Sequence, residues 1–146
     1  MEQHIITSEY IRKLPYVDFV GFINQWNVLP GAYTTLSKWA AFSRLNADSR
    51  ILELACTSGF SSRELATLTG CRGVGLDISE RAIEMARYNL KEYAPQAHIE
   101  YVCEDAHAFS PKDRFSHVIV GAALKFFPDQ KKIIEKNTKN DNKNEK

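Results

Sequence analysis

Between Arg50 and Ala123 the sequence alternates between short apolar runs and longer helical patterns. The apolar runs read RILELA, RGVGLD, HIEYVCED and FSHVIVGAA, and the helical patterns read SSRELATLTG and SERAIEMARYNLKEYA. Strands that are apolar along their length and separated by helices predict a parallel sheet covered on both faces. Because crossovers between parallel strands are right-handed, this order predicts an α/β fold with a doubly wound parallel sheet of about four strands.

Polar residues, glycine and proline mark the expected ends of the helices. Ser61 and Glu64 have the spacing of a capping box at the start of the first helix, and Gly70 is typical of its end. Ser79 is the expected N-cap of the second helix. A third helix is expected from Pro128, a residue suited to a first helical turn.

The composition divides the chain into three parts. Residues 1–48 are rich in aromatic residues and are expected to form an N-terminal helical cap or lid, with Ser8 as an N-cap and Pro15 as a break. Residues 49–136 carry the alternation and are expected to form the ligand-binding core. Residues 137–146 read NTKNDNKNEK, contain no aliphatic side chain and are expected to be disordered.

Charge and composition exclude several classes of protein. A formal net charge of +1 argues against nucleic acid or an anionic membrane as the partner. The chain shows no leader pattern and no apolar run long enough to span a bilayer, so we expect a cytoplasmic protein. Cys56, Cys71 and Cys103 lie in or beside expected strands, which predicts reduced cysteines in the core. The histidines lack metal-ligand spacing, so no metal site is expected.

Three acidic residues fall where a doubly wound sheet binds ligands, at or near the carboxyl ends of its strands. Asp77 can accept hydrogen bonds from both hydroxyls of a ribose, or it can cap the following helix. Asp105 can accept from the exocyclic amine of a purine, or it is a plain loop acid. Glu53 lies within a strand, where an isolated carboxylate is costly. A cationic ligand group or backbone donors would relieve that cost, unless the side chain reaches solvent or a lysine.

Four segments together resemble the motifs of the class I, Rossmann-like S-adenosylmethionine-dependent methyltransferases. The segment ILELACTSGF resembles their first motif, GVGLDIS their second strand with its ribose acid, and YVCEDAHAF their adenine-side acid. FSHVIVGAALKFFPDQKKIIEK resembles their fourth strand, active-site loop and next helix. The resemblance covers about residues 28–136. A dinucleotide fingerprint, G-x-G-x-x-G, is absent, which disfavours a nicotinamide or flavin site.

The resemblance implies a role for each matching residue at the methionine end of S-adenosyl-L-methionine. Glu53 would hold this end directly or through water. Backbone groups from Ala55 and Cys56 to Gly59 would line it, and Gly59 would allow close packing between helix and strand. Thr57 departs from the family, which often has glycine there. A positive φ at this position would strain threonine by about 1–3 kcal/mol.

At the adenosine end the resemblance implies four contacts. Asp77 would take the ribose hydroxyls, and Ile78 would pack on the adenine face. Asp105 would accept from the adenine amine, with the backbone N–H of Ala106 near the ring.

The methyl acceptor is less constrained by the sequence, and no catalytic residue is identified. The segment GAALKFFPD lacks the Asn/Asp-Pro-Pro-aromatic element of many nucleic-acid amino-methyltransferases, which favours a small-molecule acceptor. Leu124, Phe126 and Phe127 are candidates for the acceptor side, and Tyr33 is a candidate lid residue. Simple packing is the alternative for each of them. His107 is the one plausible base among the histidines.

The end of the sequence departs from the family pattern. A complete fold of this family continues with a fifth strand and two more, for which no sequence follows KKIIEK. The resemblance therefore implies an incomplete, C-terminally truncated methyltransferase, and a shifted reading frame or a decayed gene would explain it. We expect the fourth strand to form an exposed sheet edge that favours self-association. A non-catalytic remnant or binding module is the alternative function.

Overall fold

The computed structural model describes residues 6–138, which form one parallel sheet of four strands. The strands are β1 (Arg50–Leu54), β2 (Arg72–Asp77), β3 (Ile99–Cys103) and β4 (His117–Val120). Their order in space is β3-β2-β1-β4, and all neighbouring pairs are parallel. The chain adds strands from β1 outwards to β3 and then places β4 on the other side of β1. This order confirms the predicted doubly wound α/β sheet, with its switch point between β1 and β4.

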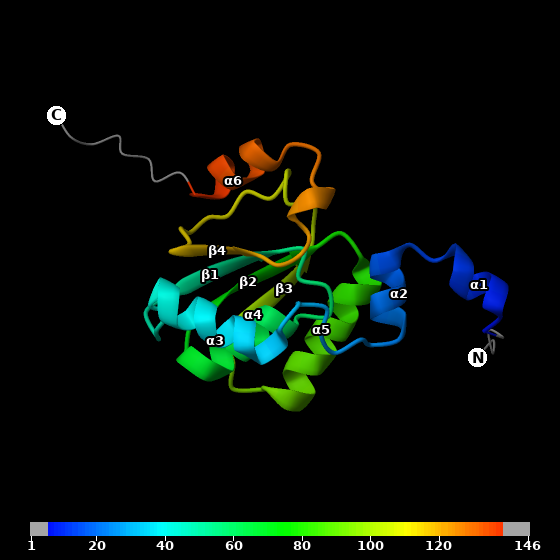
Figure 1. Cartoon of the computed structure of the whole chain (residues 1–146), viewed down its shortest axis with the longest axis horizontal. Coiled ribbons are helices and arrows are strands. Elements are labelled where there is room, and N and C mark those ends of the chain that lie inside the picture. Colours follow the sequence, from blue (N-terminus) through cyan, green and yellow to red (C-terminus); the bar gives the residue numbers. More distant parts are fainter. Residues whose placement is uncertain (1–5, 139–146) are drawn as a thin grey trace.

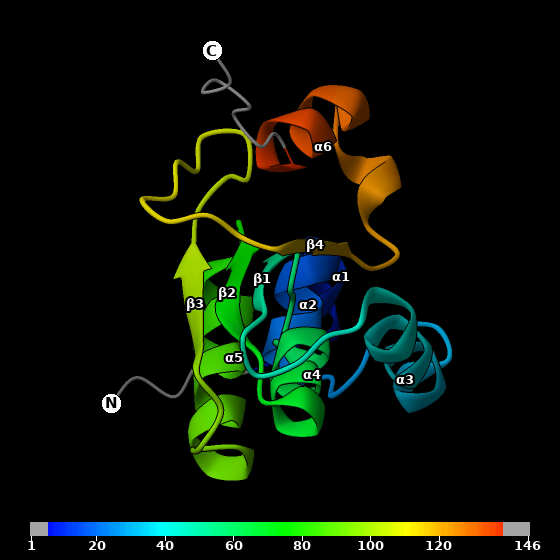
Figure 2. The same ribbon diagram turned by 90° about the vertical axis from the view of Figure 1, so that its left-hand side faces the viewer.

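Both faces of the sheet are covered. The helices concerned are α3 (Ala32–Ser43), α4 (Phe60–Thr69), α5 (Glu80–Tyr93) and α6 (Gln130–Thr138). Helices α3, α4 and α5 lie on one face and α6 on the other (Figure 1). Ile51 of β1 packs into the core shared with α3 to α5. The next residue, Leu52, packs with Ile133 of α6, and the segment between β3 and β4 lies on this second side (Figure 2). Successive side chains of β1 therefore pack into two cores, one on each face of the sheet.

Strand β4 is an edge strand, as expected, but its faces are not exposed. Within residues 6–138 it pairs with β1 alone. Ile119 is buried in the core under α3 to α5, and Val118 and Val120 pack beside Ile133 on the α6 side. The side chains on the two faces of this strand are therefore buried or half-buried. The part of β4 that is open to pairing with another strand is its outer backbone edge.

Helix α4 begins two residues earlier than its serines suggest. Gly59 is the N-cap, with φ of 79°, and has no side chain with which to cap the helix. The capping box expected at Ser61 and Glu64 is therefore wrong, because both residues already lie inside the helix. Ser61 is buried, and Glu64 pairs instead with its neighbour Arg63 at 3.1 Å. The predicted helix end is confirmed, since Gly70 adopts the left-handed C-cap conformation.

Helix α5 has the predicted cap. The side-chain oxygen of Ser79 accepts a hydrogen bond from the backbone N–H of Ala82 at 3.1 Å. The start of this helix is also covered closely by the N-terminal part of the chain. A side chain at Gly21 would meet the backbone nitrogen of Ala82 at 2.7 Å, so the helix containing Gly21 packs backbone to backbone on α5.

The N-terminal region contains two short helices before α3, α1 (Ser8–Lys13) and α2 (Tyr16–Phe22). Pro15 separates them, as predicted, but Thr7 and not Ser8 is the N-cap of α1. Helix α2 lies against α5, whereas α1 stands away from the sheet and buries no residue (Figure 1). Within residues 6–138 no helix is long and apolar enough to cross a membrane.

The segment after β4 starts with a single 3₁₀ turn, η1 (Leu124–Phe126), before α6. Pro128 was expected in the first turn of the last helix, but α6 begins two residues later. Asp129 directly precedes α6, and its side chain accepts a hydrogen bond from the backbone N–H of Lys132 at 3.1 Å. Pro128 therefore lies outside the first turn of the helix. Asn137, expected in the disordered tail, still lies within α6. The remainder of that expectation, residues 139–146, lies outside the described residues.

The three cysteines do not share one environment. Cys56 and Cys71 are buried, as predicted, whereas Cys103 is exposed. Cys103 is the last residue of β3, an edge strand, and has a neighbouring strand, β2, on one side only within residues 6–138. The prediction of core packing is wrong for Cys103.

Candidate functional site

The candidate site lies at the carboxyl edge of the sheet, where the loops after β1, β2 and β3 meet. Backbone hydrogen bonds join these loops directly. The N–H of Cys56 donates to the carbonyl of Leu76 at 2.8 Å, and the N–H of Glu104 donates to the carbonyl of Asp77 at 3.0 Å. The three strand ends that carry the sequence-derived acids therefore form one continuous edge.

The loop after β1 has the conformation of a glycine-rich turn although it contains a single glycine. Ala55, Thr57 and Gly59 have φ values of 56°, 48° and 79°. Gly59 is sterically required, because a Cβ there would lie 2.5 Å from the ring carbon Cζ of Tyr101. This contact with β3 accounts for the predicted close packing at Gly59. Ala55 and Thr57 adopt the left-handed region without the freedom of glycine, at a cost of about 1–2 kcal/mol each.

Glu53 is buried in the middle of β1, with 3% of its surface exposed. Its Oε2 accepts a hydrogen bond from the backbone N–H of Ser62 at 3.0 Å, in the first turn of α4. Burial raises the pKa of this carboxyl from 4.5 to about 7, against the lowering effect of the hydrogen bonds from Ser62. The alternative that Glu53 reaches solvent is therefore wrong. The hydrogen bond from the backbone N–H of Ser62 offsets part of the free-energy cost of burying the Glu53 carboxyl. With a pKa of about 7, this carboxyl gains or loses its proton near neutral pH.

Asp77 ends β2 and joins two loops. Its Oδ2 accepts from the backbone N–H of Thr57 at 2.9 Å, and its Oδ1 accepts from the backbone N–H of Ser79 at 3.0 Å. Burial is the main cause that raises its pKa, and these hydrogen bonds oppose it. Asp77 is not the cap of α5, because Ser79 has that role. Its carboxylate instead fixes the position of the first loop relative to the second.

The residues on the adenosine side differ in exposure. Ile78 is 71% exposed although it directly follows a buried acid. Asp105 is exposed, and its Oδ1 accepts from both the backbone N–H and the ring Nδ1 of His107, at 2.8 and 3.1 Å. The hydrogen bonds from His107 lower the pKa of Asp105. Ala106 is buried between them. An apolar side chain and an ionised acid thus flank the loops after β2 and β3.

His107 is the partner of Asp105, which the sequence did not show. Its Nε2 is buried and has no hydrogen-bond partner among the described residues. The ring also meets Phe127 edge-on, with 5.9 Å between the ring centroids. When Nδ1 carries the proton that Asp105 accepts, Nε2 is the basic nitrogen.

The candidates for the lid and the acceptor side are spread out. Tyr33, at the start of α3, meets Phe60 edge-on at 5.2 Å and is half exposed, so it stands beside the first turn of α4. Leu124 is half-buried, and Phe126 is 73% exposed. Phe127 packs into the α6 side of the core. The structure therefore brings Tyr33 to the first loop, while a role for Leu124 and Phe126 stays a prediction.

Several residues that support the first loop were missed by sequence reasoning. They are Gln25, Arg63, Asn89 and Tyr101. Each makes a hydrogen bond with Ser58 or Gly59 of the loop, and all but Arg63 come from distant parts of the chain. No local sequence pattern identifies these residues, because their hydrogen bonds to the loop join positions 5 to 42 residues apart in the sequence.

A separate groove of about 920 Å³ lies at the opposite, amino-terminal edge of the sheet. Its charged side chains are Asp48, Arg50, Arg72, Glu100, Asp113 and Arg114. Three arginines and three acids balance, and Arg50 already pairs with Asp113 at 2.8 Å. None of the sequence-derived site residues lines this groove. Within residues 6–138 no three His, Cys, Asp or Glu side chains are placed to hold a metal ion.

Comparison with known proteins agrees with this geometry. A family model described as a methyltransferase domain matches residues 51–139, and the chain belongs to that family. The segment covers β1 through α6, so it contains the whole carboxyl edge described above. The resemblance inferred from the four motifs is confirmed.

Individual relatives show how far the similarity extends. A probable cobalt-precorrin-6B C(15)-methyltransferase (decarboxylating) of Thermoplasma volcanium is 32% identical over 53% of this chain and 40% of its own length. A carboxy-S-adenosyl-L-methionine synthase of Actinobacillus succinogenes is 30% identical over 61% of this chain and 39% of its own. The chain thus spans about two fifths of the length of these curated relatives.

A solved structure supports the fold. The S-adenosyl-L-methionine-dependent methyltransferase of Geobacter sulfurreducens, solved with S-adenosyl-L-homocysteine, superposes with a TM-score of 0.72 at 18% identity. The match covers 87% of this chain and 52% of that one. It confirms the Rossmann-like arrangement of the sheet and its helices.

Proposed function

We propose that this chain binds S-adenosyl-L-methionine along the carboxyl edge of its sheet and takes part in methyl transfer to a small molecule. One observation carries the proposal: a loop with the backbone of a glycine-rich turn lies between two buried acids, Glu53 and Asp77. A bound cofactor would supply an electrophilic methyl group on a sulfonium, and the chain would bind and orient it. The S-adenosyl-L-homocysteine bound in the Geobacter structure supports the same choice of ligand.

The adenosine half of this ligand fits residues after β2 and β3. Ile78 presents an exposed apolar side chain of a size suited to one face of a purine. Asp77 has a carboxylate whose remaining lone pairs can accept from ribose hydroxyls. Asp105 is ionised in the neutral range and can accept from the exocyclic amine of adenine, with Ala106 beside it. Exposed apolar surface beside fixed acceptors favours a nucleoside over a purely polar ligand.

The methionine half fits the loop after β1. Glu53 lies behind this loop, and a cationic ammonium or sulfonium group nearby would favour its ionised form. The backbone from Ala55 through Cys56 to Gly59 can approach a ligand closely, because its side chains are small or buried. Tyr33 would cover this part of the site, and its ring contact with Phe60 supports that role.

A small-molecule acceptor is favoured by the near-neutral charge of the chain. Methyl transfer depends on alignment of a nucleophile behind the methyl group, and a base contributes where the nucleophile carries a proton. His107 remains the candidate base, because Asp105 orients its ring and its buried Nε2 has no hydrogen-bond partner among residues 6–138. Leu124 and Phe126 remain candidates for the acceptor side.

Calorimetric titration with S-adenosyl-L-homocysteine tests the cofactor assignment first. We expect saturable binding and a rise in melting temperature by mass action on the folded state, with no effect of NAD. Binding of NAD, without binding of S-adenosyl-L-methionine or S-adenosyl-L-homocysteine, would overturn the proposal. Formation of S-adenosyl-L-homocysteine during incubation with S-adenosyl-L-methionine and candidate small acceptors then separates an enzyme from a non-catalytic binding module.

We also propose that the chain associates with itself through the outer edge of β4. The other edge strand, β3, is partly blocked, because Arg87 donates two hydrogen bonds to the carbonyl of Tyr101, at 3.0 and 2.8 Å. Strand β4 pairs with β1 alone within the described residues. Unpaired edges with apolar strands favour pairing between copies. Sedimentation velocity over a wide concentration range should show dimers, and a monomer at every concentration would contradict this.

A further inference from the structure

Ser58 occupies the centre of the loop after β1 and is fully buried. It lies between Thr57 and Gly59, which both have positive φ. Its hydroxyl donates to the carbonyl of Gln25 at 2.5 Å. Its carbonyl accepts from Nη1 of Arg63 at 3.3 Å and from Nδ2 of Asn89 at 3.2 Å. A single loop residue is therefore held by three other residues, two of which, Gln25 and Asn89, are distant in sequence.

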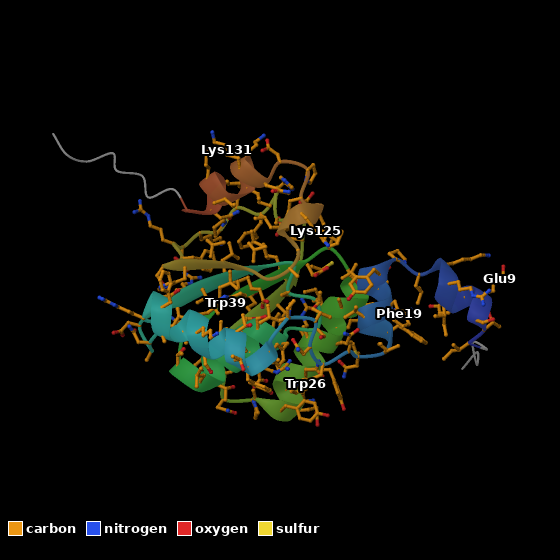
Figure 3. The ribbon with its side chains drawn as sticks, in the orientation of Figure 1. Glu9, Phe19, Trp26, Trp39, Lys125 and Lys131 are labelled. Carbon is orange, nitrogen blue, oxygen red and sulfur yellow. The ribbon has the colours of Figure 1, made fainter. Side chains whose placement is uncertain are left out.

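The partners of Ser58 are themselves fixed. Asn24 and Asn89 exchange two amide hydrogen bonds, at 2.9 and 2.8 Å. The guanidinium of Arg63 stacks on the ring of Trp26, 4.1 Å from its centroid, and Trp26 also meets Tyr93 edge-on. Figure 3 shows Trp26 beside the C-terminal half of α5, away from the open carboxyl edge. We call Asn24, Gln25, Trp26, Ser58, Arg63 and Asn89 the Ser58 cluster.

The loop needs such support because of its sequence. A non-glycine residue in the left-handed region costs about 1–2 kcal/mol, so Thr57 by itself favours another backbone conformation. A glycine at this position would adopt a φ of 48° at no steric cost. In this chain the contacts at Ser58, next to Thr57, oppose relaxation of the loop.

We propose that the Ser58 cluster is a positioning device that holds the cofactor loop in its glycine-like conformation, and that Ser58, Asn89 and Asn24 are positioning residues for cofactor binding. None of their side chains needs to touch the ligand. The consequence for cofactor affinity rests on the function proposed above, whereas the consequence for loop conformation does not. The N-terminal segment thereby contributes to binding through the loop as well as through any role as a lid.

The test is a double-mutant cycle between Ser58→Ala and Thr57→Gly. Ser58→Ala removes one hydroxyl, and Thr57→Gly removes the strain that the cluster opposes. Ser58→Ala should weaken binding of S-adenosyl-L-homocysteine about fivefold to thirtyfold in the parent, the factor that corresponds to the strain of a left-handed threonine. In the Thr57→Gly background the same change should have an effect of less than about threefold, since glycine retains the loop conformation unaided.

Two further variants complete the design. Asn24→Gly removes the amide pair with Asn89 without straining the backbone, because Asn24 already has φ of 46°. It should show the same dependence on Thr57. Ser49→Ala is the control, since Ser49 is a buried serine at the other end of the sheet that accepts from the N–H of Asn46. It should leave affinity unchanged in both backgrounds.

Amide hydrogen exchange in the unliganded protein separates failure of this inference from failure of the proposed function. The N–H of Gly59 donates to the carbonyl of Cys56 at 2.8 Å and reports on the loop. Ser58→Ala should speed its exchange in the parent much more than in the Thr57→Gly background. If the parent does not bind the adenosyl ligand, the proposed function fails and exchange alone decides this inference. Equal effects in both backgrounds, or no effect of either Ser58→Ala or Asn24→Gly, would overturn it.

Discussion

The carboxylate of Asp77 accepts a hydrogen bond from the backbone N–H of Thr57 at 2.9 Å, which joins the end of β2 to the loop after β1. The same carboxylate accepts from the backbone N–H of Ser79 at the start of α5. The residue proposed to hold the ribose therefore also determines where the methionine-side loop lies. Cofactor contacts at the two ends of the ligand are coupled through this one side chain.

Asp77→Ala should therefore reduce both stability and binding. Loss of the carboxylate leaves the N–H groups of Thr57 and Ser79 without their acceptor, which costs roughly 1–3 kcal/mol in the free energy of unfolding. Binding of S-adenosyl-L-homocysteine should weaken by a similar amount. Chemical denaturation without ligand and calorimetry well below the melting temperature measure the two effects separately. An unchanged affinity in Asp77→Ala would remove the ribose contact from the proposed site.

Glu53 predicts a dependence of stability on pH. Its pKa is about 7 in the folded state and 4.5 ordinarily, so between these values the folded protein retains a proton that the unfolded chain has lost. The contribution of this group to stability therefore falls as pH rises from about 4.5 to 7 and is constant above that range. Glu53→Gln should raise the free energy of unfolding at pH 8, by up to roughly 3 kcal/mol, and change little at pH 4.5.

Binding gives the opposite result for the same variant. A cationic ligand group beside Glu53 favours its ionised form, so binding of S-adenosyl-L-methionine near pH 6.5 should release protons. Titrations in buffers of different ionisation enthalpy measure this release. Glu53→Gln should abolish it and weaken binding, whereas Glu100→Gln, at an exposed glutamate of β3, should alter neither. Proton release that persists in Glu53→Gln would assign it to another group.

The sheet was predictable because its strands are apolar along their length and its order follows from right-handed crossovers. Ser79 and Gly70 were predictable for the same local reason, since each acts on its own helix end. The start of α4 was not. Gly59 begins that helix without a capping side chain of its own, while Ser61 lies on the buried face of the helix. A capping pattern can be satisfied in sequence and still be overridden by tertiary packing.

The acids of the site were predictable because parallel strands bring their carboxyl ends to one edge. Their partners were not. The contact of His107 with Asp105 depends on how the two side chains are oriented. The contacts at Ser58 depend on a segment more than thirty residues away, as the hydrogen bond from Ser58 to Gln25 shows. The sequence predicts strain at Thr57 if its φ is positive, and the observed φ of 48° is positive. What opposes the strain could only be seen in three dimensions.

Ala55→Gly tests the strain of the loop at its other non-glycine position. Ala55 has φ of 56°, so glycine removes a steric cost of about 1–2 kcal/mol and adds back about 0.5–1 kcal/mol of chain entropy. The free energy of unfolding should rise by about 0.5–1 kcal/mol. Ala41→Gly, at an exposed position inside α3, is the matched control and should lower it by about 1 kcal/mol. A loss of stability in Ala55→Gly would show that the loop is not strained there.

Ile78→Ala isolates the apolar contact of the proposed adenine site. Ile78 is 71% exposed, so its truncation should leave the free energy of unfolding within about 0.5 kcal/mol of the parent. If a purine covers this side chain, binding of S-adenosyl-L-homocysteine should weaken by about 1–2 kcal/mol, the value of the apolar area that the ligand would bury. Leu68→Ala is the matched control, because Leu68 is 58% exposed near the far end of α4. It should change neither quantity. Equal affinities for the parent and Ile78→Ala would place the adenine elsewhere along the carboxyl edge, and the direction of the ligand on that edge would then have to be reversed.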